Sequence, residues 1–347
     1  MLRRPAAVLL GLIVLAAGGG GGGCAAKDAS DHGAAGRAKR DVAASQRLRP
    51  VISSGESLRV IDDYVARHNK AVAAADGLAW RDLLADPMAT IADARLRIGH
   101  GRPPDRLAIA LVNPVLFVPK LDAFPKWFMV AAMERVGPHG KPHQTLMIFT
   151  QSEPEAAWRL ANKTITSAKL PKIATDGQGY AVAVSAEQPQ GRLTVALGDL
   201  ATAHVAYFTN GTAGTFADGP YTSGWRVERA AWARRLRGGG WRDTVTFGQT
   251  RYPPAALRTK DGGILAWYAV SRLDSLFPDR ASRRRRSQPD AVPADLRGYL
   301  GRPPGGSHTE VRAAWLLLPL TYVPPAGGRP AVLGQTTGLT SAATIEH

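Results

Sequence analysis

The 347-residue chain contains one cysteine, Cys24. A lone thiol cannot close an intrachain disulfide, so packed apolar side chains must stabilise every folded part of the chain. The hydrophobic fraction of 45% and the charged fraction of 21% are ordinary for globular proteins and allow such cores to form. At ~100 to 200 residues per domain, the chain is expected to form about two domains.

The cysteine follows a basic and then an apolar N-terminal segment. Arg3 and Arg4 precede an apolar run, and a run of glycines leads to Cys24. The segment resembles a bacterial lipoprotein signal, although Gly21 stands where such signals usually carry Leu. The resemblance implies removal of residues 1–23 and acylation of Cys24, for example by palmitate, at the extracytoplasmic face of the cell membrane. Plain secretion and an uncleaved anchor are the alternatives.

Changes in composition divide the chain into four parts. We expect a signal peptide over residues 1–23, a flexible tether over 24–50, a first α+β domain over 51–188, and a second α+β domain over 189–347 with an Arg/Pro loop over 278–307. The tether is rich in Ala, Asp, Ser, Gly and Arg and lacks apolar periodicity, which is typical of chain that does not pack.

Each folded part is predicted to place two helices before its strands. The first helix, residues 53–76, has the capping-box spacing of Ser53 and Glu56, and the second, residues 86–98, has Asp86 as its N-cap. Strands are predicted over residues 107–118, 127–136, 144–150 and 180–185. In the second part, helices are predicted over 199–208 and 223–237, and strands over 244–252, 264–273, 311–323 and 331–336.

This order predicts an α+β fold of two units, each with two helices and a curved antiparallel sheet. The units resemble the cone-shaped nuclear-transport-factor-2-like fold, which is also called cystatin-like. A tandem duplication would explain the repeated order of elements, and a chance similarity is the alternative. Because this fold serves many activities, it assigns no function by itself.

Four stretches carry a second resemblance that covers most of the folded chain. They are VLFVPKLDAFPKWFMV at 115–130, LMIFTQSEPEAAWRL at 146–160, ALRTKDGGILAWYAV at 256–270 and LTYVPPAG at 320–327. In this order, behind a lipoprotein-like signal, they resemble an actinobacterial extracytoplasmic lipoprotein family of unknown function. The resemblance implies a protein of the cell envelope and supplies no catalytic residues.

No sequence motif points to a catalytic nucleophile, a cofactor or a metal. His139 and His143 have a metal-ligand spacing, but Gly140 and Pro142 prevent the helix that would place both rings on one face. The chain has no G-x-S-x-G elbow, no S-x-x-K pattern at Ser167 and no phosphate-binding glycine loop. We therefore expect no catalytic, cofactor-binding or metal-binding residues and no cofactor.

Two groups of side chains are candidates for a binding site or a cavity. One set of aromatic residues is expected to line a ligand pocket or to fill the cores: Trp127, Phe128, Trp158, Trp267 and Tyr268. In the other group, Asp63 or Asp93 would face His204 or Tyr207 as an acid–base pair.

The leading hypothesis is a non-enzymatic, membrane-anchored lipoprotein that binds a ligand or a partner of the cell envelope. The first alternative is a small-molecule isomerase or cyclase with a cone-shaped cavity. The second is an electrostatic binder of anionic wall polymers, because the formal net charge is +16. Nucleic acid is not expected as a partner, since the chain carries an export signal and lacks basic runs interleaved with aromatics. The sequence leaves the oligomeric state open.

Overall fold

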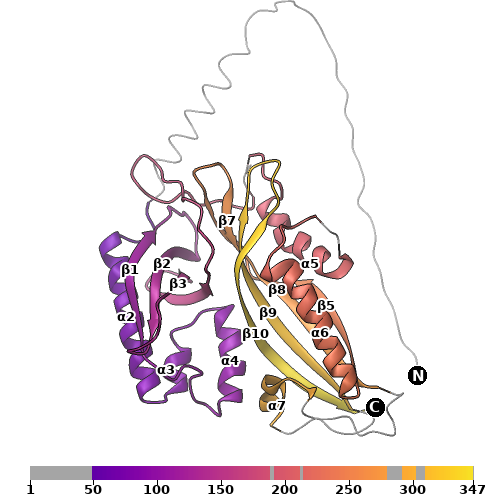
Figure 1. Cartoon of the computed structure of the whole chain (residues 1–347). Coiled ribbons are helices and arrows are strands. Elements are labelled where there is room, and N and C mark those ends of the chain that lie inside the picture. Colours follow the sequence, from indigo (N-terminus) through magenta and orange to yellow (C-terminus); the bar gives the residue numbers. More distant parts are fainter. Residues whose placement is uncertain (1–48, 188–190, 212–213, 280–290, 302–308, 347) are drawn as a thin grey trace, which may run out of the picture. The chain divides into compact units, whose positions relative to one another are not determined.

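Both halves of the folded chain begin with helices and continue into antiparallel strands (Figure 1). The computed structural model describes residues 49–187, 191–211, 214–279, 291–301 and 309–346. Residues 48–347 group into one compact unit. The predicted α+β class with two antiparallel sheets is confirmed. Cys24 and the expected signal peptide lie outside the described residues, and the expected boundary between residues 188 and 189 stays a prediction.

The first half opens with α2 (Ser54–Ala73), whose N-terminus carries the predicted capping box. The Ser53 hydroxyl accepts a hydrogen bond from the Glu56 amide at 3.2 Å, and the Glu56 carboxylate accepts one from the Ser53 amide at 3.0 Å. These bonds satisfy two donors that an open helix end would leave unpaired. The helix therefore begins where its sequence predicts.

Two short helices follow α2. The helix α3 (Gly77–Arg81) was not predicted, and Asp76 caps it by accepting a hydrogen bond from the Ala79 amide. The helix α4 (Met88–Ile98) agrees with the predicted span, but the prediction that Asp86 is its N-cap is wrong. The Asp86 carboxylate instead accepts a hydrogen bond from the Thr90 hydroxyl at 2.7 Å.

The first sheet is a four-stranded antiparallel meander. Its strands lie in chain order: β1 (Ile109–Phe117), β2 (Lys126–Val136), β3 (His143–Gln151) and β4 (Arg159–Ile165). Alternate residues of β2, namely Phe128, Val130 and Ala132, belong to the buried cluster that α2 covers. The strand period of two thus places one face of the sheet under the helix.

The predicted strand over residues 180–185 is wrong, and β4 was missed. Residues 180–185 form isolated bridges, in which the Ala181 amide donates to the Val118 carbonyl and the Val184 amide donates to the Ala256 carbonyl. Val118 follows the first sheet and Ala256 lies in the second. Since its backbone groups are shared between two sheets, the segment joins no single ladder.

The second sheet contains longer strands. These are β5 (Trp241–Gln249), β6 (Ala255–Arg258), β7 (Ile264–Trp267), β8 (Val270–Pro278), β9 (Thr309–Val323) and β10 (Ala331–Glu346). The strands β7 and β8 both pair with β9 in one continuous register. On the edge away from β9, β7 pairs with β6 and β8 pairs with β5. The strand predicted at 264–273 is therefore two consecutive strands, β7 and β8, which are separated by Tyr268 and Ala269 and share one register with β9.

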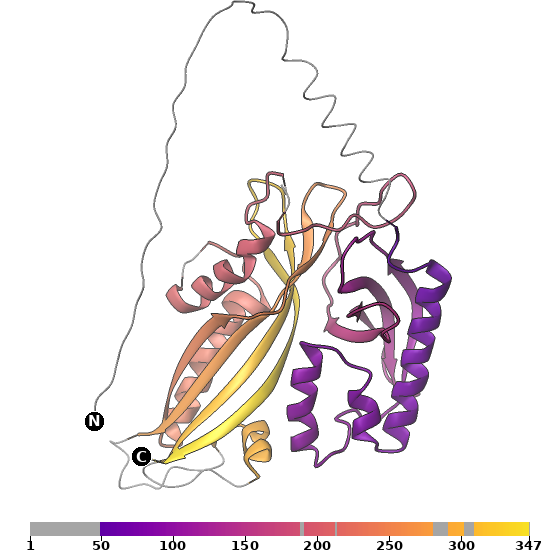
Figure 2. The ribbon, with the colours of Figure 1, turned by 180° about the vertical axis from the view of Figure 1, so that it is seen from behind.

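The helices of the second half are α5 (Leu200–Asn210), α6 (Trp225–Gly238) and α7 (Ala294–Leu300). A π-helical turn over Pro220–Gly224 leads into α6. Figure 2 shows α5 and α6 on one side of the folded unit and α2 on the other, with the sheets between them.

The two halves share a core. Met129, Leu146 and Ile148 of the first sheet pack in one buried cluster with Leu265 and Trp267 of the second. The helix α4 also lies against β10 (Figure 1). This packing gives the chain more buried apolar surface than either sheet would have alone.

Candidate functional site

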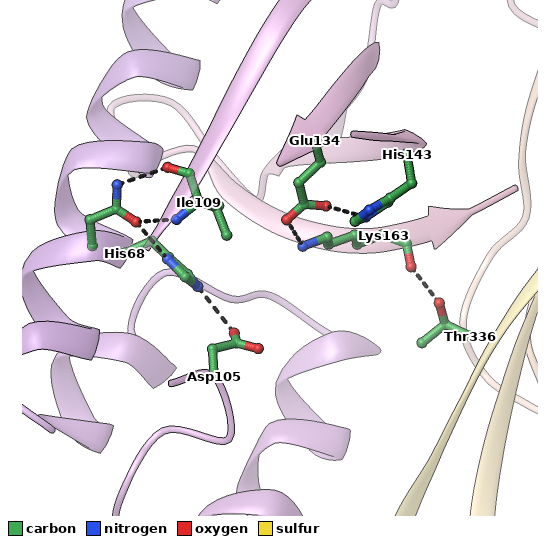
Figure 3. A network of polar contacts seen from close by, with 8 residues as sticks. His68, Asp105, Ile109, Glu134, His143, Lys163 and Thr336 are labelled. Atoms are coloured by element: carbon green, nitrogen blue, oxygen red, sulfur yellow. Dashed lines mark hydrogen bonds and ion pairs between the residues drawn. The ribbon is translucent and has the colours of Figure 1, made fainter. Parts of the chain in front are cut away.

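A cluster of titratable side chains lies between α2 and the first sheet (Figure 3). At its centre is Glu134 of β2, which is 0% exposed. The Lys163 ammonium from β4 lies 2.5 Å from Glu134 Oε1, and His143 Nε2 from β3 lies 3.4 Å from Glu134 Oε2. A buried carboxylate requires such partners, because burial without them disfavours its charge strongly.

The strand registers bring these groups together. Glu134 pairs directly with His143, and Lys163 pairs with Met147 on the next strand. Glu134 occupies the next inward position after Val130 and Ala132, so its carboxylate continues an otherwise apolar row. The Lys163 backbone is held from the second half, where the Thr336 hydroxyl donates to the Lys163 carbonyl (Figure 3).

Three polar atoms in this cluster are buried and have no hydrogen-bond partner among the described residues. They are Glu134 Oε2, His143 Nε2 and Thr145 Oγ1. Lys163 and His143 are partly exposed, at 23% and 30% of their side-chain surface. The cluster thus has a buried acidic floor and a partly open basic rim, which is an arrangement suited to proton transfer or to a small polar ligand.

His68 on α2 extends the cluster. Its Nε2 lies 3.1 Å from Asp105, and its Nδ1 lies 3.2 Å from the Asn69 side-chain oxygen. That oxygen also accepts a hydrogen bond from the Ile109 amide, so both ring nitrogens of His68 lie next to oxygen atoms of neighbouring side chains. Burial raises the pKa of Asp105, but the His68 hydrogen bond and the nearby charges of His68, Lys163 and Arg95 together outweigh burial, so this pKa lies below its ordinary value.

An aromatic row connects this cluster to the opposite end of α2. Trp158 lies edge-on to Phe128, Phe128 stacks on Phe149, and Phe149 lies edge-on to Tyr64, with centroid distances of 5.0, 5.4 and 5.3 Å. Tyr64 in turn lies 5.9 Å from His68. Burial, with the nearby charges of Glu134 and Asp105, raises the pKa of Tyr64, so its phenol stays protonated.

At the Trp158 end of this row, the protein surface has a cleft of about 570 Å³. The side chains of Val51, Val60, Ala157 and Trp158 contribute its apolar part. Its charged lining consists of Glu56, Arg59, Asp63 and Arg67. Since α2 supplies these four charged residues and Val60, this one helix builds half of the lining. We call this the Trp158 cleft.

The five aromatic residues singled out from the sequence lie in three different places. Trp158 lines the cleft, and Phe128 is buried behind it in the same core. Trp127 and Trp267 lie in the core shared by the sheets. Tyr268 is buried in the second half, where its hydroxyl lies 2.7 Å from His204 Nδ1.

The structure does not bring together the expected acid–base pair. Asp63 forms an exposed ion pair with Arg67 on α2, and Asp93 pairs with Arg81 at 2.5 Å. His204 is fully buried, and burial lowers its pKa to about 3. Sequence reasoning missed Glu134 and Lys163; the available signal was an acidic residue at an inward position of an apolar strand.

A second buried charge cluster lies between α6 and the second sheet. Arg272 and Asp274 on β8 form an ion pair at 3.1 Å, and Arg229 of α6 pairs with Asp243 of β5. The Arg272 guanidinium lies 4.7 Å from the centre of the Trp315 ring. Two cations and two anions balance here, so the cluster has the composition of a structural ion network.

Among the described residues, no group of three or more His, Cys, Asp or Glu side chains is placed to hold a metal ion. None of the described helices has both the length and the apolar character needed to cross a bilayer.

The chain is similar to proteins of one family. The family described as domain of unknown function (DUF8094) matches residues 48–344. An uncharacterised lipoprotein of Streptomyces coelicolor is 27% identical over 303 residues, covering 85% of this chain and 87% of the relative. An uncharacterised lipoprotein of Streptomyces avermitilis is 25% identical over 234 residues, covering 66% and 68%. No solved structure matches the chain.

Proposed function

The chain belongs to the DUF8094 family, and from that premise we propose that it is a membrane-anchored lipoprotein that binds a ligand or partner of the cell envelope without converting it chemically. The expected actinobacterial lipoprotein family is the one found. Two lipoprotein relatives and the signal-like segment before Cys24 support a lipid anchor at that residue on the extracytoplasmic face.

The Trp158 cleft is the observation that carries the binding proposal. Its volume of about 570 Å³ lies within the range of ~300 to 1,000 Å³ typical of ligand pockets. A large aromatic side chain supplies contact area at a low entropic cost, and Trp158 is held in place by its edge-on contact with Phe128. The cleft is therefore preorganised on one side.

The lining chemistry favours a ligand with one apolar face and several polar groups. Arg67 is shared between Asp63 and Asp82, while Arg59 has no ion-pair partner among the described residues. Such a mixture suits the face of a sugar, a lipid headgroup region or a polyketide, with Arg59 available for an acceptor oxygen.

A blocking substitution tests this proposal. Ala157 is exposed and lines the cleft, so Ala157→Arg would fill the cleft without disturbing the core. Ala66→Arg, at an exposed position of α2 outside the lining, is the matched control. The full chain, purified from envelopes in a neutral detergent, should retain a molecule detectable by native mass spectrometry that is lost only from Ala157→Arg. Identical spectra for wild type and Ala157→Arg would refute binding at this cleft.

A second candidate function is a small-molecule isomerase or cyclase, and buried Glu134 favours it. Such chemistry needs a carboxylate base and a protonated donor. Tyr64 is a nearby protonated donor, because burial and then the Glu134 charge raise the pKa of its phenol. The Lys163 ammonium would compete for the carboxylate, which is why binding is the leading proposal.

The reactive probe 5-nitrobenzisoxazole distinguishes these functions, because it loses a carbon-bound proton to a protein carboxylate. If the protein only binds, wild type and Glu134→Gln should open the probe at the same rate. A faster reaction with wild type, lost in Glu134→Gln but retained in Ala157→Arg, would support the enzyme and count against the binding proposal.

The net charge of +16 supports a third possibility, binding to anionic wall polymers. Salt screens exposed charges over about 10 Å at 0.1 M. High salt should then release the protein, after removal of its acyl chains, from isolated walls. Retention that does not change with salt would exclude this binding mode.

A further inference from the structure

A second hollow, of about 260 Å³, lies in the other half of the folded chain. Its lining comes from the C-terminal end of α5, the turn before α6, the first turn of α6 and the turn between β9 and β10: Tyr207, Gly214, Phe216, Asp218, Ser223, Arg226 and Arg329. None of these residues lines the Trp158 cleft. The hollow therefore requires its own explanation.

Two guanidinium groups face this one hollow from separate segments. Arg226 is held by the end of α5, where its Nη1 donates to the Gly211 carbonyl at 3.4 Å. Its guanidinium carbon also lies 5.9 Å from the centre of the Tyr207 ring. Gly211 is the left-handed C-cap of α5, with φ of 64°, so the position of Arg226 depends on a defined helix end.

A backbone hydrogen bond holds the turn that carries Arg329 close to the segment that carries Asp218. The Ala217 amide donates to the Pro330 carbonyl at 2.8 Å. This bond ties the segment that carries Asp218 to the turn that carries Arg329. Within the described residues, neither Arg226 nor Arg329 forms an ion pair with a carboxylate.

Neutral and acidic groups complete the lining. The Ser223 hydroxyl accepts a hydrogen bond from the Gly219 amide at 3.2 Å, which leaves its hydrogen free to donate into the hollow. Asp218 contributes one negative charge, so the lining has one positive charge in excess. This excess attracts an anion. The Asp218 carboxylate repels the anion and so moderates the affinity.

We propose that this hollow binds a phosphate group, with Arg226 and Arg329 as its principal ligands. Guanidinium groups match the geometry of phosphate oxygens and bind them with two parallel hydrogen bonds. A phosphate ester carries about −1.5 to −2 charges at pH 7, which suits two arginines better than a carboxylate with a single charge does. The volume lies just below the usual range for ligand pockets, which points to a phosphate with a small substituent.

The group can come from soluble phosphate or from the headgroup of a phospholipid. Calorimetry on the full chain in a non-ionic detergent would use inorganic phosphate as the probe and acetate as the control. Arg329→Gln is the decisive variant, since Arg329 is exposed and its replacement leaves the core intact. Loss of one charged hydrogen-bond donor should weaken phosphate binding about tenfold or more.

Asp218→Asn supplies a control with the opposite sign. Removal of the negative charge should tighten phosphate binding several-fold, whereas a general weakening of the fold would loosen it. The proposal is overturned if phosphate does not bind, if acetate binds equally well, or if Arg226→Gln and Arg329→Gln both bind like wild type. If phosphatidic acid in mixed micelles competes with phosphate, the group comes from a lipid headgroup. If phosphate binds but phosphatidic acid does not compete, the group comes from soluble phosphate.

Discussion

Glu134 and His143 face each other across β2 and β3, with 3.4 Å between Glu134 Oε2 and His143 Nε2. The carboxylate is fully buried, and Lys163 holds its other oxygen at 2.5 Å. The end of the apolar core between α2 and the first sheet is thus closed by charges. The stability of this end depends on the charges remaining paired.

Removal of Lys163 tests this dependence. Lys163→Met should lower the free energy of unfolding by about 3 kcal/mol, because it leaves the Glu134 charge buried with weaker compensation. The double variant Glu134→Gln/Lys163→Met should recover much of that loss, since no uncompensated charge remains. Urea unfolding at pH 7 gives both values. A double variant less stable than Lys163→Met would contradict this account.

Buried His204 predicts a loss of stability in acid. Its pKa is lowered to about 3 in the folded state, from 6.5 in an exposed histidine, so below pH 6.5 the unfolded state binds the proton first. The contribution of neutral His204 to the free energy of unfolding is fully present above pH 6.5. It falls as the pH drops towards 3, by up to roughly 4 kcal/mol.

The variant His204→Phe should remove that part of the pH dependence. The ring fits among Phe208 and Phe216, and Tyr268 keeps Thr321 as a hydrogen-bond partner at 3.2 Å. Unfolding midpoints in urea at pH 7 and pH 4 should therefore differ less in His204→Phe than in wild type. An equal difference would show that His204 does not contribute.

The close approach of α4 to β10 predicts that Gly338 tolerates no side chain. A Cβ added at Gly338 would overlap the Ile91 side chain. Gly338→Ala should destabilise the fold by about 1 to 3 kcal/mol, as overpacked cores do. The matched control is Gly55→Ala on α2, where nothing lies within 4 Å and alanine should stabilise by about 0.5 kcal/mol. Thermal unfolding of both variants checks the opposite signs.

Loss of the capping box at the start of α2 should measurably lower the stability of the protein. Ser53→Ala should destabilise the protein by about 1 kcal/mol, because the Glu56 amide loses its acceptor. The Ser53 hydroxyl and amide hydrogen bonds lower the pKa of Glu56. In Ser53→Ala the pKa of Glu56 should rise towards its ordinary value, which NMR titration can follow. An unchanged Glu56 pKa would mean that the hydroxyl bond contributes nothing.

Local chemistry predicted α2 and α4 better than it predicted β4. The capping box fixed the start of α2, and the predicted end of α4 at residue 98 agrees with its C-cap at Gly99, because both helix ends depend on contacts within a few residues. Strand β4 has the sequence RLANKTI and was missed, since its burial comes from β3 on one edge and from packing against β10. Both sheets follow helices and run as meanders, while tandem duplication and the cone-shaped fold stay predictions.

The sequence by itself determined the fold class, the first helices, most strands and the family, because these depend on short-range periodicity and on characteristic stretches. It also singled out Trp158, as one of five aromatic residues expected to line a ligand pocket or to fill the cores, but it did not distinguish Trp158 from the other four. Only the tertiary structure decided which polar groups meet. Glu134, His143 and Lys163 come from three strands, and Arg226 and Arg329 lie about a hundred residues apart in the chain. Such groups converge through strand register and packing between distant segments, and no local pattern encodes either.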